Sequence, residues 1–338
     1  MSEIERRKRD HIGIVLSGKA QHSRAAGFDE IAFRHNALPD CDYAEIDLST
    51  AFLGRQLRLP YLASSMTGGP DVSEGINRAI AEAAQEMRFA LGVGSQRIAL
   101  TTGESHGLDQ TLRKLAPDVP IYANLGAVQL VHGMGRDQAM RAVEQIGADA
   151  LILHLNPLQE VLQEGGDRNW RGVGAAIAQL ARNFPLPIIV KEVGSGISAE
   201  VAQRLADCGV AAVDVAGAGG TSWAAVEGRR AGDAAGQELG EVFRDWGIPT
   251  TDCLIEIHRI LPSLPLVASG GIRSGLDGAK AIRLGATLVG QAGALLPAAM
   301  RGTEAVIMHV TEWATALRIA CFATGSRNLG ELRSAALI

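Results

Sequence analysis

Three observations predict that this chain folds as an α/β protein with a (β/α)8 (TIM) barrel. Eight short apolar runs alternate with helical patterns in one continuous series, which favours a closed parallel barrel over an open sheet. A glycine-entered strand recurs along the chain, and 338 residues fit one large barrel with additions. The expected strands are 57–64, 89–93, 120–125, 150–155, 187–191, 211–216, 265–269 and 286–290.

The junctions between helices and strands carry the repeat. Gly147, Gly209 and Gly285 each stand just before an apolar strand run, and a glycine there is expected to end the preceding helix. The stretch from Val72 to Met87 places apolar residues on one helical face. Each repeated unit is therefore one strand and one helix.

Composition bounds the class of protein. Hydrophobic residues make up 47% of the chain and charged residues 20%, with a net charge of -5, so we expect a soluble protein with no general attraction to nucleic acid. The four cysteines are widely separated, which argues against a disulfide framework or a zinc site. The N-terminus lacks an apolar signal core, and we expect a cytoplasmic protein with no membrane segment.

Three segments lie outside the regular alternation. We expect residues 1–56 to form an N-terminal arm that packs on a barrel of residues 57–338, the whole being one domain. The basic run Arg6–Arg9 is either a solvated tail or an arm over a phosphorylated ligand. A polar loop follows strand four (165–170), and a longer, charged, glycine-rich insertion follows strand six (223–248). Both lie on the side where barrels place their chemistry and their lids.

Two glycine-rich turns near the end of the chain predict a phosphate site. The turns Gly270–Gly275 and Gln291–Ala294 each follow a buried strand. Glycine lets the backbone come close to a ligand, and N–H groups beside a helix N-terminus suit phosphate. Two such turns in series are typical of phosphate binding in barrel enzymes.

Polar residues at the strand ends would converge on the mouth of the barrel. Lys191 closes the apolar run Ile188–Val190, so it requires an anionic partner, and it fits either a Schiff base or a contact to a flavin ring. Glu160 is a hard oxygen ligand that suits Mg²⁺ when phosphates supply the other ligands. His154 is by itself as consistent with packing as with catalysis.

Taken together, these motifs resemble the type 2, FMN-dependent isopentenyl diphosphate isomerases across nearly the full length. The specific pieces are His154-Leu155-Asn156 with Gln159-Glu160, joined to the basic arm Arg7–His11 and to Ser65–Gly69. Further matches are Phe28–Ile31, Gly94–Arg97, Lys191–Gly194, Gly219–Trp223 and Ser269–Arg273, the last being shared by many flavin barrels.

The resemblance implies a substrate and its ligands. It implies conversion of isopentenyl diphosphate to dimethylallyl diphosphate on reduced FMN, with Mg²⁺ on Glu160 and NADPH as the reductant. Catalysis would involve Gln159, Glu160 and His154. The isoprenoid diphosphate would be held by Arg7, Lys8, Arg97, His154, Asn156 and Gln159. FMN would be held by Ser65, Met66, Thr67, Ser95, Asn124, Lys191, Thr221, Gly271, Ile272, Arg273, Ala292 and Gly293.

Two alternatives share the flavin barrel. An FMN-dependent 2-hydroxy-acid oxidase needs a His base beside an Arg, but the corresponding loop, 216–221, contains neither. A non-catalytic flavin-binding protein would have no use for the cations and carboxylate of the diphosphate site. The resemblance also implies a homo-oligomer, a tetramer or an octamer, whose interface no sequence pattern identifies.

Overall fold

Eight parallel strands form the centre of the molecule. In the computed structural model, which describes residues 3–65, 72–105 and 107–338, they are β3 (Tyr61–Ala63), β4 (Ala90–Gly92), β5 (Ile121–Gly126), β6 (Ala150–Leu155), β7 (Ile188–Glu192), β8 (Ala212–Asp214), β9 (Leu266–Ala268) and β10 (Leu288–Gln291). They close in the order β10-β3-β4-β5-β6-β7-β8-β9. The (β/α)8 barrel predicted from the sequence is confirmed.

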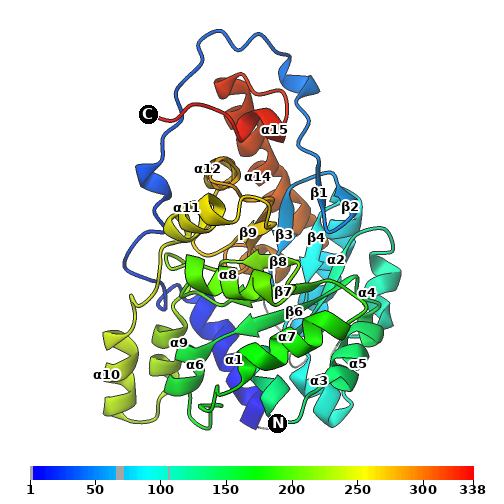
Figure 1. Cartoon of the computed structure of the whole chain (residues 1–338), viewed down its shortest axis with the longest axis vertical. Helices are drawn as coiled ribbons and strands as arrows, with labels where there is room; N and C mark the ends of the chain where they lie inside the picture. Colours follow the sequence, from blue (N-terminus) through cyan, green and yellow to red (C-terminus); the bar gives the residue numbers. More distant parts are fainter. Residues whose placement is uncertain (1–2, 66–71, 106) are drawn as a thin grey trace.

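Helices surround this barrel (Figure 1). The α-helices between the first strands are α2 (Val72–Met87), α3 (Arg97–Thr102), α4 (Gln110–Leu115), α5 (Arg136–Ile146), α6 (Pro157–Leu162), α7 (Val173–Asn183) and α8 (Ala199–Asp207). Those that follow β8 are α9 (Trp223–Arg230), α10 (Ala234–Val242), α11 (Thr250–Ile260), α12 (Gly275–Arg283), α13 (Leu296–Ala299), α14 (Thr303–Thr324) and α15 (Leu329–Leu332). A 3-10 turn, η3 (Ala127–Val131), follows β5.

A hairpin closes one end of the barrel. Strand β1 (Thr50–Phe52) pairs antiparallel with β2 (Arg55–Leu57), and Phe52 and Leu57 are buried with the apolar side chains of the barrel interior. The sequence interpretation placed a barrel strand at 57–64, but Leu57 belongs to this hairpin. The chain turns at Pro60 before the barrel strand begins at Tyr61, because proline cannot donate a ladder hydrogen bond.

The N-terminal residues cross the opposite end. Helix α1 (Glu3–Leu16) packs against α9 (Figure 1). The following chain is tied to the loop after β8, since the N–H of His22 donates to the carbonyl of Gly220 (2.9 Å) and that of Ser222 to Ala20 (2.8 Å). Two 3-10 turns, η1 (Phe28–Glu30) and η2 (Tyr43–Glu45), lead from there to the hairpin.

The insertions differ in structure from each other. Residues 165–170 form an irregular loop after α6, as expected. Residues 223–248 were predicted as a charged, glycine-rich insertion after strand six. They contain two regular helices, α9 and α10, which pack together. Their helix starts are capped by Ser222 and Asp233 side chains, a signal that favours helix and that outweighs the glycines. Gly228 and Gly240 meet where the two helices cross, and a Cβ on either would collide with the other's backbone.

The glycine junctions behave as predicted. Gly147, Gly209 and Gly285 follow α5, α8 and α12 with φ of 62°, 86° and 108°, which are left-handed conformations that favour glycine. Each residue ends its helix and starts the turn into the next strand, which confirms the repeated unit.

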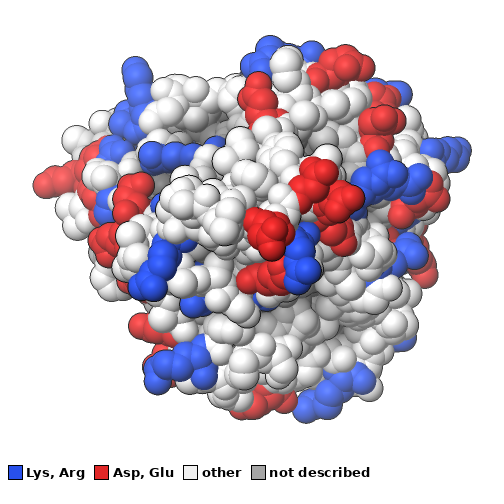
Figure 2. Space-filling view, turned by 90° about the horizontal axis from the view of Figure 1, so that it is seen from above, with Lys and Arg blue, Asp and Glu red and all other residues white. Residues whose placement is uncertain are grey.

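The outer surface carries charges of both signs. Figure 2 shows basic and acidic side chains interspersed over the face seen from above. One helix of the described part, α14, is long and apolar enough to cross a membrane by length and composition alone. It packs against α2 and α12 and buries Val306, Val310 and Leu317, which is the position of an outer barrel helix.

Candidate active site

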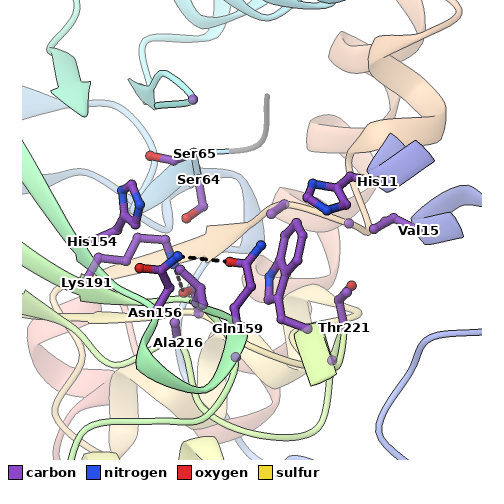
Figure 3. A pocket seen from close by; sticks show the side chains of 18 of the residues that line it. His11, Val15, Ser64, Ser65, His154, Asn156, Gln159, Lys191, Ala216 and Thr221 are labelled. Atoms are coloured by element: carbon purple, nitrogen blue, oxygen red, sulfur yellow. Dashed lines mark hydrogen bonds between the residues drawn. The ribbon is translucent and has the colours of Figure 1, made fainter. Parts of the chain in front are cut away.

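A cavity of about 490 Å³ opens at the carboxyl ends of the strands. It is lined by side chains from the arm, from the strand ends and from the two glycine-rich turns (Figure 3). Every candidate residue that the structure describes lies in its wall: Arg7, Lys8, Ser65, Ser95, Arg97, Asn124, His154, Asn156, Gln159, Glu160, Lys191, Thr221, Gly271, Ile272, Arg273, Ala292 and Gly293. Met66 and Thr67 lie outside the described residues.

The arm contributes two cations. Arg7 and Lys8 lie on α1 and line the cavity. The Nζ atom of Lys8 is buried and has no hydrogen-bond partner within the described part of the chain. Burial, followed by repulsion from Arg7, lowers the pKa of Lys8 to about 7. A buried amine without a partner at the wall of a cavity is a group that an anionic ligand could satisfy.

His154 is held in one tautomer. Its Nδ1 lies 2.7 Å from Oδ1 of Asn124, whose Nδ2 donates to the carbonyl of Val93 (3.0 Å). Because that carbonyl can only accept, Asn124 presents its oxygen to His154, so Nδ1 carries the proton and Nε2 keeps a lone pair. Burial, and then the cations Lys191 and Lys8, lower the pKa of His154 to about 4. The imidazole is therefore neutral at pH 7 while the cavity holds no anion.

Glu160 is fixed by the start of its own helix and by the loop that follows. The Nδ2 of Asn156 donates to Oε1 of Glu160 (2.9 Å), and the N–H of Asp167 donates to Oε2 (2.7 Å). Asp167 in turn accepts from Arg97 Nη1 (2.9 Å) and from Gln129 Nε2 (2.8 Å). Through Asp167, the loop 165–170 therefore links the carboxylate of Glu160 to Arg97. The sequence predicted Glu160 and Arg97 as separate site residues, without this link.

Glu227 joins the arm to the strand ends, and sequence reasoning missed it. It is 3% exposed. Its Oε1 accepts from His11 Nε2 (2.9 Å) and Gln159 Nε2 (3.0 Å), and its Oε2 accepts from Arg230 Nη1 (2.6 Å). Burial opposes its charge, but the hydrogen bonds from His11 and Gln159, together with the charges of His11 and Arg230, outweigh burial, so the pKa of Glu227 is lowered. The sequence feature that could have identified Glu227 is its position one helical turn after Trp223, which belongs to the matched motif Gly219–Trp223.

Lys191 has the anionic partner that the sequence required. Its Nζ lies 3.3 Å from Oδ2 of Asp214, which is 1% exposed, and donates to the carbonyl of Glu192 (2.9 Å). Asp214 also accepts from the hydroxyl of Ser269. Asp214 therefore supplies the carboxylate partner, and Lys191 lies in the cavity wall, where it can contact a flavin ring. Glu192 lies outside the cavity wall, and its carboxylate accepts backbone N–H groups of 193–195.

The two glycine-rich turns present unused donors. Gly270 and Gly271 have φ of 95° and 71°, and a Cβ on Gly270 would collide with the carbonyl of Gly217. Among the hydrogen bonds of the described residues, none uses the N–H of Gly271, Gly293 or Ala294. Free N–H groups in adjoining turns form a concave site for an anion such as a phosphate.

Comparison with known proteins identifies the family. A sequence model of the FMN-dependent dehydrogenases matches residues 168–338. An isopentenyl-diphosphate delta-isomerase of Xanthobacter autotrophicus is 57% identical over 97% of this chain and 96% of its own length. The isopentenyl-diphosphate delta-isomerase of Pseudescherichia vulneris is 56% identical over 98% of this chain and 96% of its length. The chain belongs to the isopentenyl-diphosphate delta-isomerase family. It is a flavoprotein of the FMN class.

Two solved structures of low sequence identity are similar to this isomerase family member in fold alone. A flavocytochrome b2 superposes with a TM-score of 0.70 at 18% identity, covering 97% of this chain and 82% of its own. A mandelate oxidase superposes with a TM-score of 0.68 at 18% identity, covering 100% of this chain and 99% of its own. These similarities support the barrel fold and give no information about the reaction.

Proposed function

We propose that this protein interconverts isopentenyl diphosphate and dimethylallyl diphosphate on reduced FMN, with Mg²⁺ and with NADPH as the reductant. The observation that carries the proposal is the unpartnered Nζ of Lys8, which the arm places over the same cavity as the free N–H groups of the glycine turns. We infer from this that one cavity would receive two anions, the diphosphate of the substrate and the phosphate of the cofactor. The family assignment supports the same reading.

The diphosphate end of the substrate is proposed to lie between the arm and strand β6. Arg7 and Lys8 approach from α1, and Arg97, His154 and Asn156 from the strand ends. Figure 3 shows His154 and Asn156 on one side of the cavity and His11 of α1 on the other. Cations on two sides neutralise a diphosphate and fix its position, which leaves the short alkene tail to reach further into the cavity.

Glu160 is proposed to hold Mg²⁺. The described residues contain no group of three or more His, Cys, Asp or Glu side chains that could hold a metal, so the protein alone forms no closed site. The hard oxygens available are the carboxylate of Glu160 and the buried Oδ1 of Asn156, which lacks a hydrogen-bond partner within the described chain. This donor set fits Mg²⁺, which takes one or two carboxylates and completes its shell with phosphates and water.

The remaining wall fits FMN. The N–H groups of Gly271 and Gly293 would receive its phosphate. Lys191 would face its ring, together with Ser65, whose hydroxyl is buried and unpartnered in the described chain. The rest of the wall proposed for FMN is formed by Ser95, Asn124, Thr221, Ile272, Arg273 and Ala292. Met66 and Thr67 are proposed from the sequence alone. When bound in its reduced form, FMN supplies an electron-rich ring able to take part in proton transfer to an alkene.

The side chains of this protein would orient and shield that transfer. Gln159 lines the cavity, and its amide is fixed by Glu227, which His11 holds in turn. Isomerisation of an alkene needs an acid and a base at defined positions. We propose that Gln159 directs the alkene and that Glu227 acts behind it, through the hydrogen bond that sets the position of the amide.

The location, assembly and binding partners of the protein are also proposals. The protein is proposed to be a cytoplasmic homo-oligomer, a tetramer or an octamer, and to bind neither nucleic acid nor membrane. The oxidase alternative has no support in the loop 216–221, which holds neither His nor Arg. The non-catalytic alternative does not account for Lys8, Glu160 and Gln159 in the cavity wall.

The test is direct. The purified protein, loaded with reduced FMN and Mg²⁺, is incubated with isopentenyl diphosphate, and formation of dimethylallyl diphosphate is followed. Replacement of Arg7 and Lys8 by alanine should raise the KM for the diphosphate strongly while FMN stays bound. Absence of interconversion would refute the proposed function, and an unchanged KM would return the two residues to the charged-tail interpretation.

A further inference from the structure

A buried glutamine connects the outer helix α14 to the first glycine-rich turn, Gly270–Gly275. Gln291, the last residue of β10, is 2% exposed and lines the cavity. Its amide nitrogen donates to the carbonyl of Ile272 (3.1 Å). Because a carbonyl can only accept, the atom facing Ile272 must be Nε2, and the amide oxygen must point the other way.

Two donors from outside the barrel mouth hold that oxygen. The hydroxyl of Tyr61 lies 2.9 Å from Oε1 of Gln291, and Nε2 of His309 lies 2.7 Å from it. Since Oε1 is an acceptor, both groups donate, which places the proton of a neutral His309 on Nε2. Tyr61 is fully buried and packs edge-on against Trp313 of α14 (ring centroids 5.0 Å apart). Two of the three groups that hold the amide, the Tyr61 hydroxyl and the His309 ring, therefore belong to residues that do not line the cavity.

The amide restrains one peptide group of the turn. The peptide between Ile272 and Arg273 is held at its oxygen by Gln291 and at its N–H by Oδ2 of Asp277 (3.0 Å). Its carbonyl is therefore occupied by the amide of Gln291, while the N–H of Gly271 in the same turn has no acceptor among the described residues. A carbonyl turned toward the same space would repel an anion.

We propose that His309 and Tyr61 are positioning residues for the phosphate of the flavin. By donating to Gln291 they direct its N–H onto Ile272 and keep the turn 270–273 in the conformation that receives a phosphate. This inference rests on the FMN site proposed above. It adds two residues, one on β3 and one on α14, that act through Gln291 without touching the cofactor.

The experiment compares FMN with riboflavin, which is the same ring system without the phosphate. Dissociation constants of both are measured by quenching of flavin fluorescence on the flavin-free protein. H309L removes a donor at similar volume, H309Q keeps an N–H within reach, and Y61F removes only the hydroxyl. H309L and Y61F should each weaken FMN binding roughly five- to tenfold, the value of one buried hydrogen bond. Riboflavin binding should not change, and H309Q should bind FMN as the unaltered protein does.

Controls separate positioning from structural support. T315A on the same helix removes an exposed hydroxyl whose hydrogen bond within the described chain is to the carbonyl of Thr311 (2.8 Å), and it should alter neither constant. Thermal unfolding without flavin shows whether each variant folds, and Y61F preserves the ring packing if the His309 variants are unstable. Equal weakening of FMN and riboflavin, or H309Q as weak as H309L, would overturn the inference. If the unaltered protein bound no FMN, the proposed function itself would fail.

Discussion

Substrate binding should be coupled to proton uptake at Lys8. Burial and Arg7 lower the pKa of Lys8 to about 7, so at pH 8 roughly nine-tenths of this side chain is neutral while the cavity holds no anion. A bound diphosphate would return its pKa toward the ordinary value of 10.5. Binding at pH 8 should therefore take up roughly 0.9 proton at this residue. Because the free group has the lower pKa, affinity should fall as pH rises from 7, by up to roughly tenfold per unit.

The assay is calorimetry of isopentenyl diphosphate binding to the oxidised, FMN-loaded protein with Mg²⁺. Titrations in two buffers of different ionisation enthalpy give the number of protons taken up. In K8R the guanidinium stays charged, so uptake at pH 8 should drop by nearly one proton, and the loss of affinity between pH 7 and 9 should shrink. Protons taken up by the ligand, or by His154, are common to both proteins and cancel in the difference.

K19R is the matched control, because Lys19 is an exposed lysine just after the same helix and outside the cavity wall. It should show the same proton uptake as the unaltered protein. Equal uptake by K8R and the unaltered protein would refute the reasoning, since it would mean that Lys8 is already charged before the diphosphate arrives.

Four further outcomes are expected. Glu160→Ala and Gln159→Ala should abolish turnover with FMN still bound; activity of Glu160→Ala at low Mg²⁺ would remove its metal role. Glu227→Gln should lower kcat by roughly a hundredfold, since an amide cannot accept from His11, Gln159 and Arg230 as the carboxylate does and Gln159 would lose its position; unchanged kcat would make the carboxylate structural. Dithionite should replace NADPH entirely, and air should stop the reaction; NADPH consumed in proportion to product would contradict isomerisation. Phe52→Ala should lower the free energy of unfolding by about 3–5 kcal/mol without changing KM, as urea denaturation and steady-state kinetics would show.

The local pattern was enough to predict the barrel and most of the cavity wall. Apolar runs and glycine junctions define strand and helix by sterics and burial alone, and parallel strands bring their carboxyl ends to one mouth. The sequence therefore predicted that Lys191, His154 and the two glycine-rich turns lie at the same mouth of the barrel, but not which residues they contact. The hairpin at Phe52 was not predicted, because its pairing depends on the end of the barrel that it covers. Helix α10 was not predicted either, because its glycines suggested irregular structure although Asp233 caps its start.

The sequence by itself thus determined the fold, the family motifs and the types of chemical group in the cavity. Only the tertiary structure decided the partners of each group: Asp214 for Lys191, Asn124 for His154, and Glu227 for Gln159. These partners lie far apart in the chain, and a side chain's charge state and tautomer depend on burial and on neighbours within a few ångströms. Such distances follow from how the strands and the arm pack, which no spacing along the chain encodes.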